Sequence, residues 1–154
     1  MDMAPAKLKR PASAPVARLL DQVARAMHSI GHDGGLFPAQ WTALRYFRDA
    51  AVPHNTAMGL ARFQGLAFGP VSRSVRTLIE KGLLRKAGSA GRGRSEIVEL
   101  TSMGCALLKA DPLLVVVRAI ETMPPEQAES LAMACEAIIA AIQAQKHEST
   151  QAAE

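Results

Sequence analysis

The chain has 154 residues, which is enough for one domain with a buried core and too few for two ordinary ones. Hydrophobic residues make up 49% of the chain and aromatic residues only 4%, and the abundance of Ala, Leu and Val favours packed helices over a β-sandwich. Residues 1–100 carry 15 Lys and Arg against 7 Asp and Glu, whereas residues 101–154 carry 3 against 7. Positive charge is concentrated in one part of the chain, which predicts a polyanionic partner.

Neither a membrane span nor a secretory signal is expected. The longest apolar run, residues 113–117, is far shorter than the ~20 residues that cross a bilayer. The first residues are basic but lack an apolar central region, so we expect a cytoplasmic protein. Cys105 and Cys135 form neither a zinc-ligand pattern nor a disulfide framework, and are predicted to be small buried hydrophobic residues.

The first third of the chain predicts a basic arm followed by two helices. Residues 1–15 are rich in Pro, Ala and basic residues and are expected to be disordered. A helix is predicted over 16–32, and a second begins at Pro38 and runs to about residue 50. The inward-facing residues are predicted to be Val16, Leu19, Leu20, Val23, Met27 and Ile30 in the first helix, and Trp41, Leu44 and Phe47 in the second.

Residues 57–100 predict a helix-turn-helix followed by a β-hairpin. A short helix over about 57–64, capped by Asn55 or Thr56, presents Leu60, Ala61 and Phe63 to the core and closes at Gly65. A second helix opens at Gly69-Pro70 and ends at Gly82. Its inner face is Val71, Val75, Leu78 and Ile79, and its outer face is Ser72, Arg73, Arg76 and Thr77. Two strands, beginning at Leu83 and Glu96, flank a flexible glycine-rich tip over 88–94.

The remainder predicts helices with unusually exposed apolar surface. Thr101 caps a helix that meets Asp111-Pro112, a dipeptide that either kinks this helix or caps a new one. Residues 113–120 are apolar nearly all round, and a final helix after 123–126 carries another apolar stripe. The tail 146–154 is expected to be flexible. We predict one domain over 16–145, with a DNA-binding core at about 38–100 and dimerisation through helices at 16–32 and 101–145.

The charge within residues 56–95 indicates double-stranded DNA as the partner. This segment holds eight basic residues and a single acidic one, Glu80. A helix-turn-helix lays its second helix in the major groove, where Arg pairs with guanine, and a basic tip can enter the minor groove. The predicted DNA contacts are Pro70, Ser72, Arg73, Arg76, Thr77, Arg92 and Arg94. For these arginines the alternative is contact with phosphate only, or a solvated surface.

Two strings within this region resemble the MarR-type winged-helix transcriptional regulators. They are V-S-R-x-V-x-x-L-x-x-K-G-L-L from Val71 to Leu84 and L-T-x-x-G from Leu100 to Gly104, within a resemblance that covers about 36–145. The resemblance implies a mainly α fold with a β-hairpin wing and a homodimer. Many members of the family respond to small aromatic or phenolic ligands, and some to oxidants or metals. In the family an Asp often stands two residues before the wing arginine, whereas here Arg92 stands two before Arg94.

Candidate sensing residues lie on the first two helices. They are His28, His32, Trp41 and Arg45. Arg45 could pair with a ligand carboxylate and Trp41 could stack on an aromatic ring, although core packing and surface charge explain the same residues. No metal set, cofactor motif, catalytic triad or phosphate loop is found, so neither a metal nor a cofactor nor an enzyme is expected.

The sequence therefore predicts a homodimeric, sequence-specific DNA-binding repressor that releases DNA or alters its DNA binding on sensing a small ligand, with an aromatic compound as the candidate class. Its operator is expected to be an inverted repeat with half-sites roughly 34–36 Å apart. The alternative is a winged-helix module that binds protein and shows no sequence preference on DNA.

Overall fold

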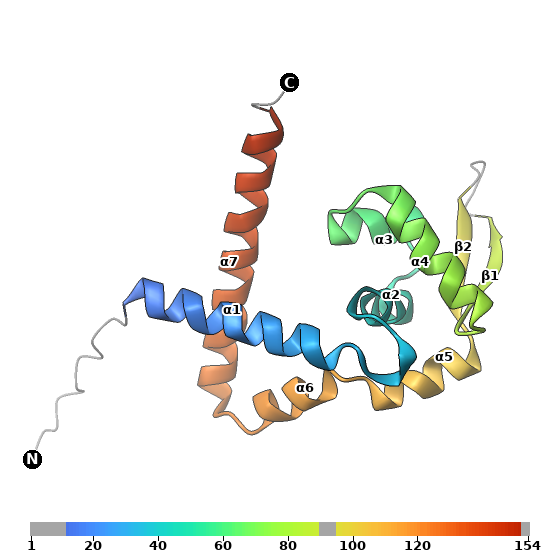
Figure 1. The fold of residues 1–154 in the computed structure, drawn as a ribbon. Helices are drawn as coiled ribbons and strands as arrows, with labels where there is room; N and C mark the ends of the chain where they lie inside the picture. The colour runs from blue at the N-terminus through green and yellow to red at the C-terminus, as the bar shows by residue number, and fades with distance from the viewer. Residues whose placement is uncertain (1–11, 90–94, 152–154) are drawn as a thin grey trace, which may run out of the picture. The chain divides into compact units, whose positions relative to one another are not determined.

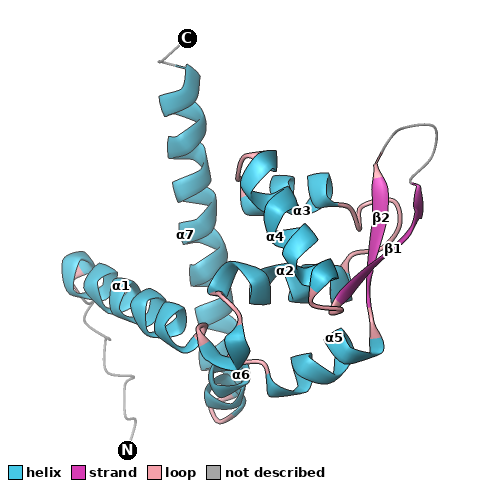
Figure 2. Ribbon diagram, turned by 45° about the vertical axis from the view of Figure 1, so that its right-hand side comes forward, coloured by secondary structure: helices cyan, strands magenta, loops and turns pink. Residues whose placement is uncertain are grey.

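The computed structural model describes residues 12–89 and 95–151, and the chain forms two compact units that join between Pro112 and Leu113. Figure 1 and Figure 2 show helices and one antiparallel hairpin, which confirms the predicted fold class. The first unit contains α1 (Ser13–Ile30), a 3-10 turn (Asp33–Gly35), α2 (Pro38–Asp49), α3 (Ala57–Gln64), α4 (Phe68–Glu80), β1 (Leu84–Ser89), β2 (Glu96–Leu100), α5 (Ser102–Leu107) and a second 3-10 turn (Leu108–Ala110). The second unit contains α6 (Leu114–Glu121) and α7 (Pro125–Gln151).

The core of the first unit lies where α2, α4 and the hairpin meet. Trp41 and Leu44 of α2 pack with Leu78 of α4, and each of the three is at most 1% exposed. Leu84 and Val98 bring the two strands onto the same core. Because apolar residues recur at helical spacing in α2 and α4, burial of one face leaves the other face of each helix to solvent or to a partner.

The turn between α3 and α4 follows from local signals. Thr56 caps α3, its hydroxyl accepting a hydrogen bond from the Gly59 amide at 3.0 Å. Gly65 ends α3 in the left-handed conformation with φ 62°, which glycine adopts without a steric penalty. The predicted span of α3 is therefore confirmed at both ends.

The wing is an antiparallel pair that is joined by a third, short extended segment. Leu84 pairs with Leu100 and Ser89 with Glu96, with an irregularity between Lys86 and Gly88. The Val98 amide donates to the Asn55 carbonyl at 2.8 Å, and the Asn55 side chain donates to the Val98 carbonyl at 3.3 Å. The connector before α3 is thus held along the outer edge of β2, an arrangement that the sequence did not predict.

Several predicted boundaries differ from the structure. α1 begins at Ser13, inside the segment expected to be a disordered arm, and α7 continues to Gln151, beyond the expected start of the tail. β1 extends to Ser89, two residues into the predicted flexible tip. Asp111 caps no helix, because α6 begins after Leu113 without a side-chain cap. The side chain of Asp111 is used in an ion pair, described below.

Two predictions of burial were wrong. Cys105 is exposed and Cys135 is only half-buried, although both were expected in the core. Phe63 was expected to face the core and is 66% exposed, with its ring beside that of Tyr46 at a centroid distance of 5.2 Å. Helical spacing correctly placed these residues on apolar faces, but it does not say whether the same chain covers the face.

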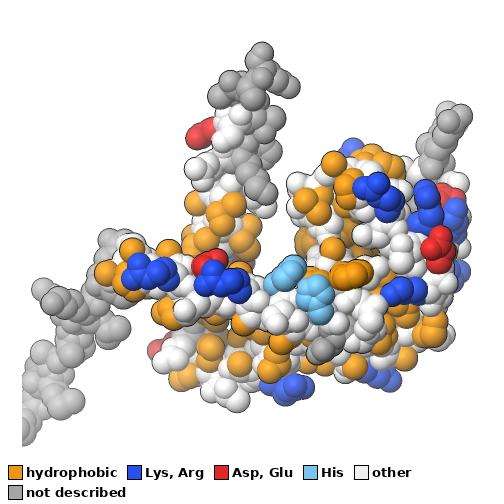
Figure 3. Space-filling model, in the orientation of Figure 1, with side chains coloured by type: hydrophobic (Ala, Val, Ile, Leu, Met, Phe, Trp, Pro, Cys, Tyr) orange, Lys and Arg blue, Asp and Glu red, His pale blue; other side chains and the backbone are white. Residues whose placement is uncertain are grey.

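The helices α1, α6 and α7 carry apolar side chains that their own unit leaves exposed. Figure 3 shows hydrophobic side chains at the surface of α1. This helix has no buried residue, and its Leu19 and Val23 are 60% and 51% exposed. On α7, Ile139 and Ile142 are 54% and 52% exposed. Over the described residues, none of the helices combines the length and the apolar character that a membrane span requires. The single domain over 16–145 remains a prediction, because each unit is compact by itself.

Candidate nucleic-acid interface

The predicted recognition helix α4 presents two arginines outward. Val71, Val75 and Leu78 are at most 5% exposed and anchor its inner face, while Arg73 and Arg76 are exposed on the opposite side. Among the described residues, neither arginine takes part in an ion pair. Both guanidinium groups are therefore available to a ligand without first breaking an ion pair within the described chain.

The other predicted contacts on α4 lie near these arginines. Pro70 is exposed in the first turn, and Ser72 and Thr77 are half-buried. The Thr77 hydroxyl donates to the Arg73 carbonyl at 3.1 Å, so its proton is used within the helix and its oxygen remains able to accept. The other two predicted contacts, Arg92 and Arg94 of the wing tip, lie outside the described residues.

The wing is less positive than the sequence count suggests. Arg85 pairs with Glu99 across the strands, and Lys86 pairs with Glu96 at 2.9 Å. The charge count over residues 56–95 included Arg85 and Lys86 but stopped before their partners, Glu96 and Glu99. The strand register, which the hairpin fixes, brings each pair together. These exposed pairs contribute little to stability, but they lower the local positive potential.

The other described cations of residues 56–89 lie on the two helices of the helix-turn-helix, α3 and α4, or directly after α4. Lys81, at the end of α4, donates to the Gly35 carbonyl at 2.8 Å. Arg62 of α3 is exposed and, like the α4 arginines, makes no ion pair with any described residue. Figure 3 shows blue side chains over this part of the first unit. Within residues 56–89 the arginines that make no ion pair with any described residue are therefore Arg62, Arg73 and Arg76, and Lys81 adds a fourth cation without a carboxylate partner among them.

A groove of about 280 Å³ separates α4 from the wing. Arg76 and Ser72 of α4 line one side of it, and Lys86 and Glu96 of the wing line the other. Glu80, the single acidic residue of the recognition helix, also lines this groove. Arg76 and Ser72 therefore face the wing.

The packing of α3 depends on a close approach to the preceding loop. A Cβ added at Gly59 would lie 2.0 Å from the His54 carbonyl oxygen and 2.5 Å from the Tyr46 hydroxyl. That hydroxyl donates to the same carbonyl at 2.7 Å. Burial raises the pKa of Tyr46 above its ordinary value, because the charged form would be less well solvated. The signal for this contact in the sequence was a glycine inside a helix.

The candidate sensing residues occupy different environments. Trp41 is 1% exposed and belongs to the core. His28 and His32 are exposed, with ring centroids 5.2 Å apart at the end of α1 (Figure 3, pale blue). The described residues contain no group of three potential metal ligands. These four residues therefore do not line one common cavity.

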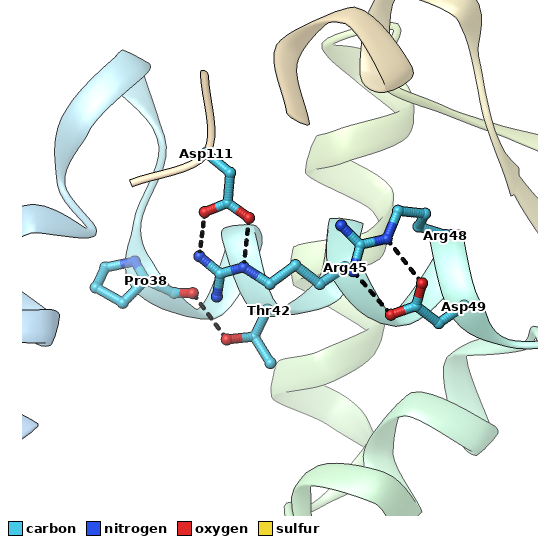
Figure 4. A network of polar contacts seen from close by, with 6 residues as sticks. All are labelled: Pro38, Thr42, Arg45, Arg48, Asp49 and Asp111. Atoms are coloured by element: carbon cyan, nitrogen blue, oxygen red, sulfur yellow. Dashed lines mark hydrogen bonds and ion pairs between the residues drawn. The ribbon is translucent and has the colours of Figure 1, made fainter. Parts of the chain in front are cut away.

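Arg45 forms a bidentate ion pair with Asp111. Its Nε and Nη2 donate to the two carboxylate oxygens at 2.7 and 2.6 Å (Figure 4). A separate cavity of about 320 Å³ between α2 and α3 is lined by Thr42, Arg45, Tyr46, Asp49, Ala50 and Phe63. The sequence analysis missed the Asp111 partner and the contribution of Tyr46 and Phe63 to this cavity.

The structure resembles solved structures of transcriptional regulators, although no family model and no curated protein matches the chain. A mutant of MarR from E. coli is 17% identical with a TM-score of 0.62, covering 85% of this chain and 98% of that one. A MepR mutant from S. aureus, bound to an oligodeoxyribonucleotide, is 15% identical with a TM-score of 0.55, covering 86% and 99%. BpsR of Bordetella bronchiseptica, whose DNA binding is regulated by 6-hydroxynicotinic acid, is 18% identical with a TM-score of 0.61, covering 80% and 98%.

The chain has the MarR-type winged-helix fold. At this level of identity the likeness establishes the fold alone, and the predicted resemblance is confirmed in that sense. In this fold α4 is the second helix of the helix-turn-helix and the β1–β2 hairpin is the wing. Arg73 and Arg76, which make no ion pair within the described residues, thus lie on the second helix of the helix-turn-helix.

Proposed function

We propose that this protein is a cytoplasmic, homodimeric transcriptional repressor that binds double-stranded DNA sequence-specifically. The observation that carries the proposal is the outer face of α4, where Arg73 and Arg76 are exposed and unpaired within the described residues. A MarR-type fold in which a neighbour, the S. aureus MepR mutant, is bound to DNA supports the same reading. Arg73 and Arg76 would contact guanine edges or phosphates of the major groove, together with Pro70, Ser72 and Thr77.

The wing would complete the interface. Arg92 and Arg94 remain predicted minor-groove contacts, since a narrow minor groove attracts arginine. The paired cations Arg85 and Lys86 would contribute less, because each already has a carboxylate partner. Each protomer would therefore contact one half-site with α4 in the major groove and the wing tip in the adjacent minor groove.

Dimerisation would cover the apolar faces of the terminal helices. Leu19, Val23, Ile139 and Ile142 are each more than half exposed within their own unit, and burial of such side chains stabilises association by roughly 25 cal/mol for each Å². A two-fold dimer presents two recognition helices, so the operator would be an inverted repeat with half-sites about one helical turn apart.

A small aromatic effector would act at the cavity between α2 and α3. Tyr46 and Phe63 supply an aromatic wall. Arg45 lines the same cavity and, because its Nε and Nη2 are held by Asp111, would offer a ligand only its remaining N–H groups. BpsR, a neighbour whose DNA binding responds to 6-hydroxynicotinic acid, supports an aromatic acid as the ligand class. Trp41 is too buried to stack on a ligand without rearrangement, while His28 and His32 remain predicted sensing residues.

Random-site selection followed by fluorescence anisotropy on the selected duplex tests the proposal. We expect wild type to prefer an inverted repeat over shuffled DNA by at least about a hundredfold, a modest ratio for a specific regulator. Arg73→Ala with Arg76→Ala should remove that preference, whereas Arg48→Ala, an exposed arginine of α2 paired with Asp49, should not. Failure to enrich any sequence, with a stable heteromeric protein partner instead, would favour the interaction-module alternative.

A further inference from the structure

The Arg45–Asp111 pair holds the last residues of the first compact unit, which ends at Pro112 and is called the winged-helix unit below. The two residues are 66 positions apart, and both guanidinium-to-carboxylate bonds are short (Figure 4). The side chain of Asp111 is 5% exposed and that of Arg45 is 22% exposed. A paired, nearly buried carboxylate is held in one direction, because a bidentate guanidinium fixes orientation as well as distance.

The backbone at this point is restricted as well. Asp111 has φ −56° and ψ 124°, the extended conformation favoured before a proline, and the ring of Pro112 limits its own φ. The first compact unit ends at Pro112, and the second begins at Leu113. Side chain and backbone thus restrain the last two residues of the first unit.

We propose that Arg45–Asp111 is a positioning clamp that sets which half-site spacing the dimer accepts. This inference depends on the proposed function, since it needs a dimer that carries one winged-helix unit per protomer. The clamp lies outside the predicted DNA contacts and acts on them through the chain direction at Pro112. With Asp111 released, the first unit would be held to the dimer through α1 alone, so that the two recognition helices would adapt to several spacings.

An ion pair suits this role better than an apolar contact would. Apolar side chains of similar volume are often as stabilising as a buried ion pair, so stability alone does not call for Arg45 and Asp111. An apolar contact, however, does not restrain the orientation of its side chains as a bidentate ion pair does. The pair is therefore best explained by the orientation that it enforces.

The test uses full-length wild type and three variants. Asp111→Asn removes one acceptor and the charge while keeping the shape, and Arg45→Met with Asp111→Leu replaces the pair by apolar residues should the first variant unfold. Arg48→Met is the matched control, because Arg48–Asp49 on the same helix is also bidentate but pairs neighbours in sequence and is exposed (Figure 4).

Affinity is measured on the selected inverted repeat and on duplexes with two base pairs inserted or deleted at its centre. Two base pairs change the half-site separation by ~7 Å and rotate one site by about 70°. We expect wild type and Arg48→Met to lose at least about tenfold in affinity, and the clamp variants to lose less than about threefold, as expected when a protein reorients at little cost. The readout is the ratio of the affinities for duplexes of different half-site spacing. A general loss of stability leaves this ratio unchanged.

A second measurement needs no DNA. A single spin label at Arg62→Cys, in a Cys105→Ser and Cys135→Ser background, reports the distance between the two winged-helix units of a dimer. The distance distribution should be narrow in wild type and broad in the clamp variants. The clamp would be overturned if its variants remained dimeric and showed both the affinity ratios of wild type and a narrow distance distribution. That outcome would leave the proposed DNA binding intact. A wild type that binds no duplex would instead overturn the proposed function.

Discussion

Replacing Gly104 by alanine should destabilise the protein, although the same change inside a helix is ordinarily favourable. Gly104 lies in the first turn of α5, and Ala has a higher helix propensity than Gly by about 1 kcal/mol. In the structure, however, a Cβ at this position would lie 2.2 Å from the Leu83 carbonyl oxygen and 2.9 Å from Leu100 Cδ2. The first neighbour is backbone and cannot rotate away, so either α5 or the start of the wing must move.

The magnitude follows from what that movement disturbs. The Leu83 carbonyl accepts a hydrogen bond from the Thr101 amide at 3.1 Å, and the Thr101 hydroxyl donates to the Gly82 carbonyl at 2.6 Å. Overpacking costs ~1–3 kcal/mol, and a weakened backbone hydrogen bond adds about 1 kcal/mol. After the propensity gain, a net loss of roughly 1–3 kcal/mol remains, which lowers Tm by about 3–10 °C for a chain of this size.

Urea unfolding followed by circular dichroism at 222 nm measures this loss. Gly69→Ala is the matched control, because Gly69 is also in the first turn of a helix but has no neighbouring atom within 4 Å of an added Cβ. We expect this control to be neutral or stabilised by up to about 1 kcal/mol. If Gly104→Ala were as stable as the control, the close contact between α5 and Leu83 would be refuted.

Three further outcomes are expected. On the selected duplex, Arg73→Ala with Arg76→Ala should make the plot of log K for DNA binding against log salt concentration less steep, by about 0.9 for each phosphate that is no longer neutralised. Weaker binding with an unchanged slope would instead indicate an indirect effect. The single tyrosine, Tyr46, should titrate above its ordinary pKa in the folded state and at about 10 in urea, so that stability falls as pH rises above about 10; absorbance at 295 nm reports it. Leu19→Glu on α1 should shift the dimer to monomer in sedimentation equilibrium while leaving the helical content of the winged-helix unit intact, and an unchanged dimer would exclude this face as the interface.

The elements that the sequence predicted well are those with local signals at both ends. α3 was located to the residue because Thr56 is a cap and Gly65 can take a positive φ. The inner and outer faces of α4 were separated correctly because Val71, Val75 and Leu78 recur at helical spacing. Such signals act within a few residues, so a single sequence contains them in full.

The features that the sequence missed depend on contacts between distant positions. The partner of Arg45 is 66 residues away, and Asp111 looked like a helix cap because Asp before Pro is a common start signal. Phe63 and Cys105 were expected inside because their spacing is helical, yet periodicity identifies an apolar face without naming what covers it. Pairing of Arg85 with Glu99 required the strand register, which a count of charges along the sequence does not contain.

The pairing of wing charges also bounds how the protein can hold DNA. Within residues 56–89, each subunit of the proposed dimer has three described arginines, Arg62, Arg73 and Arg76, that make no ion pair with any described residue. A dimer would thus neutralise about six phosphates, which corresponds to a salt slope of about −5. A measured slope steeper than about −7 would require further cations, for which Arg92 and Arg94 are the predicted source. A slope close to that of six phosphates would instead mean that the tip adds little charge, so that recognition depends chiefly on α4.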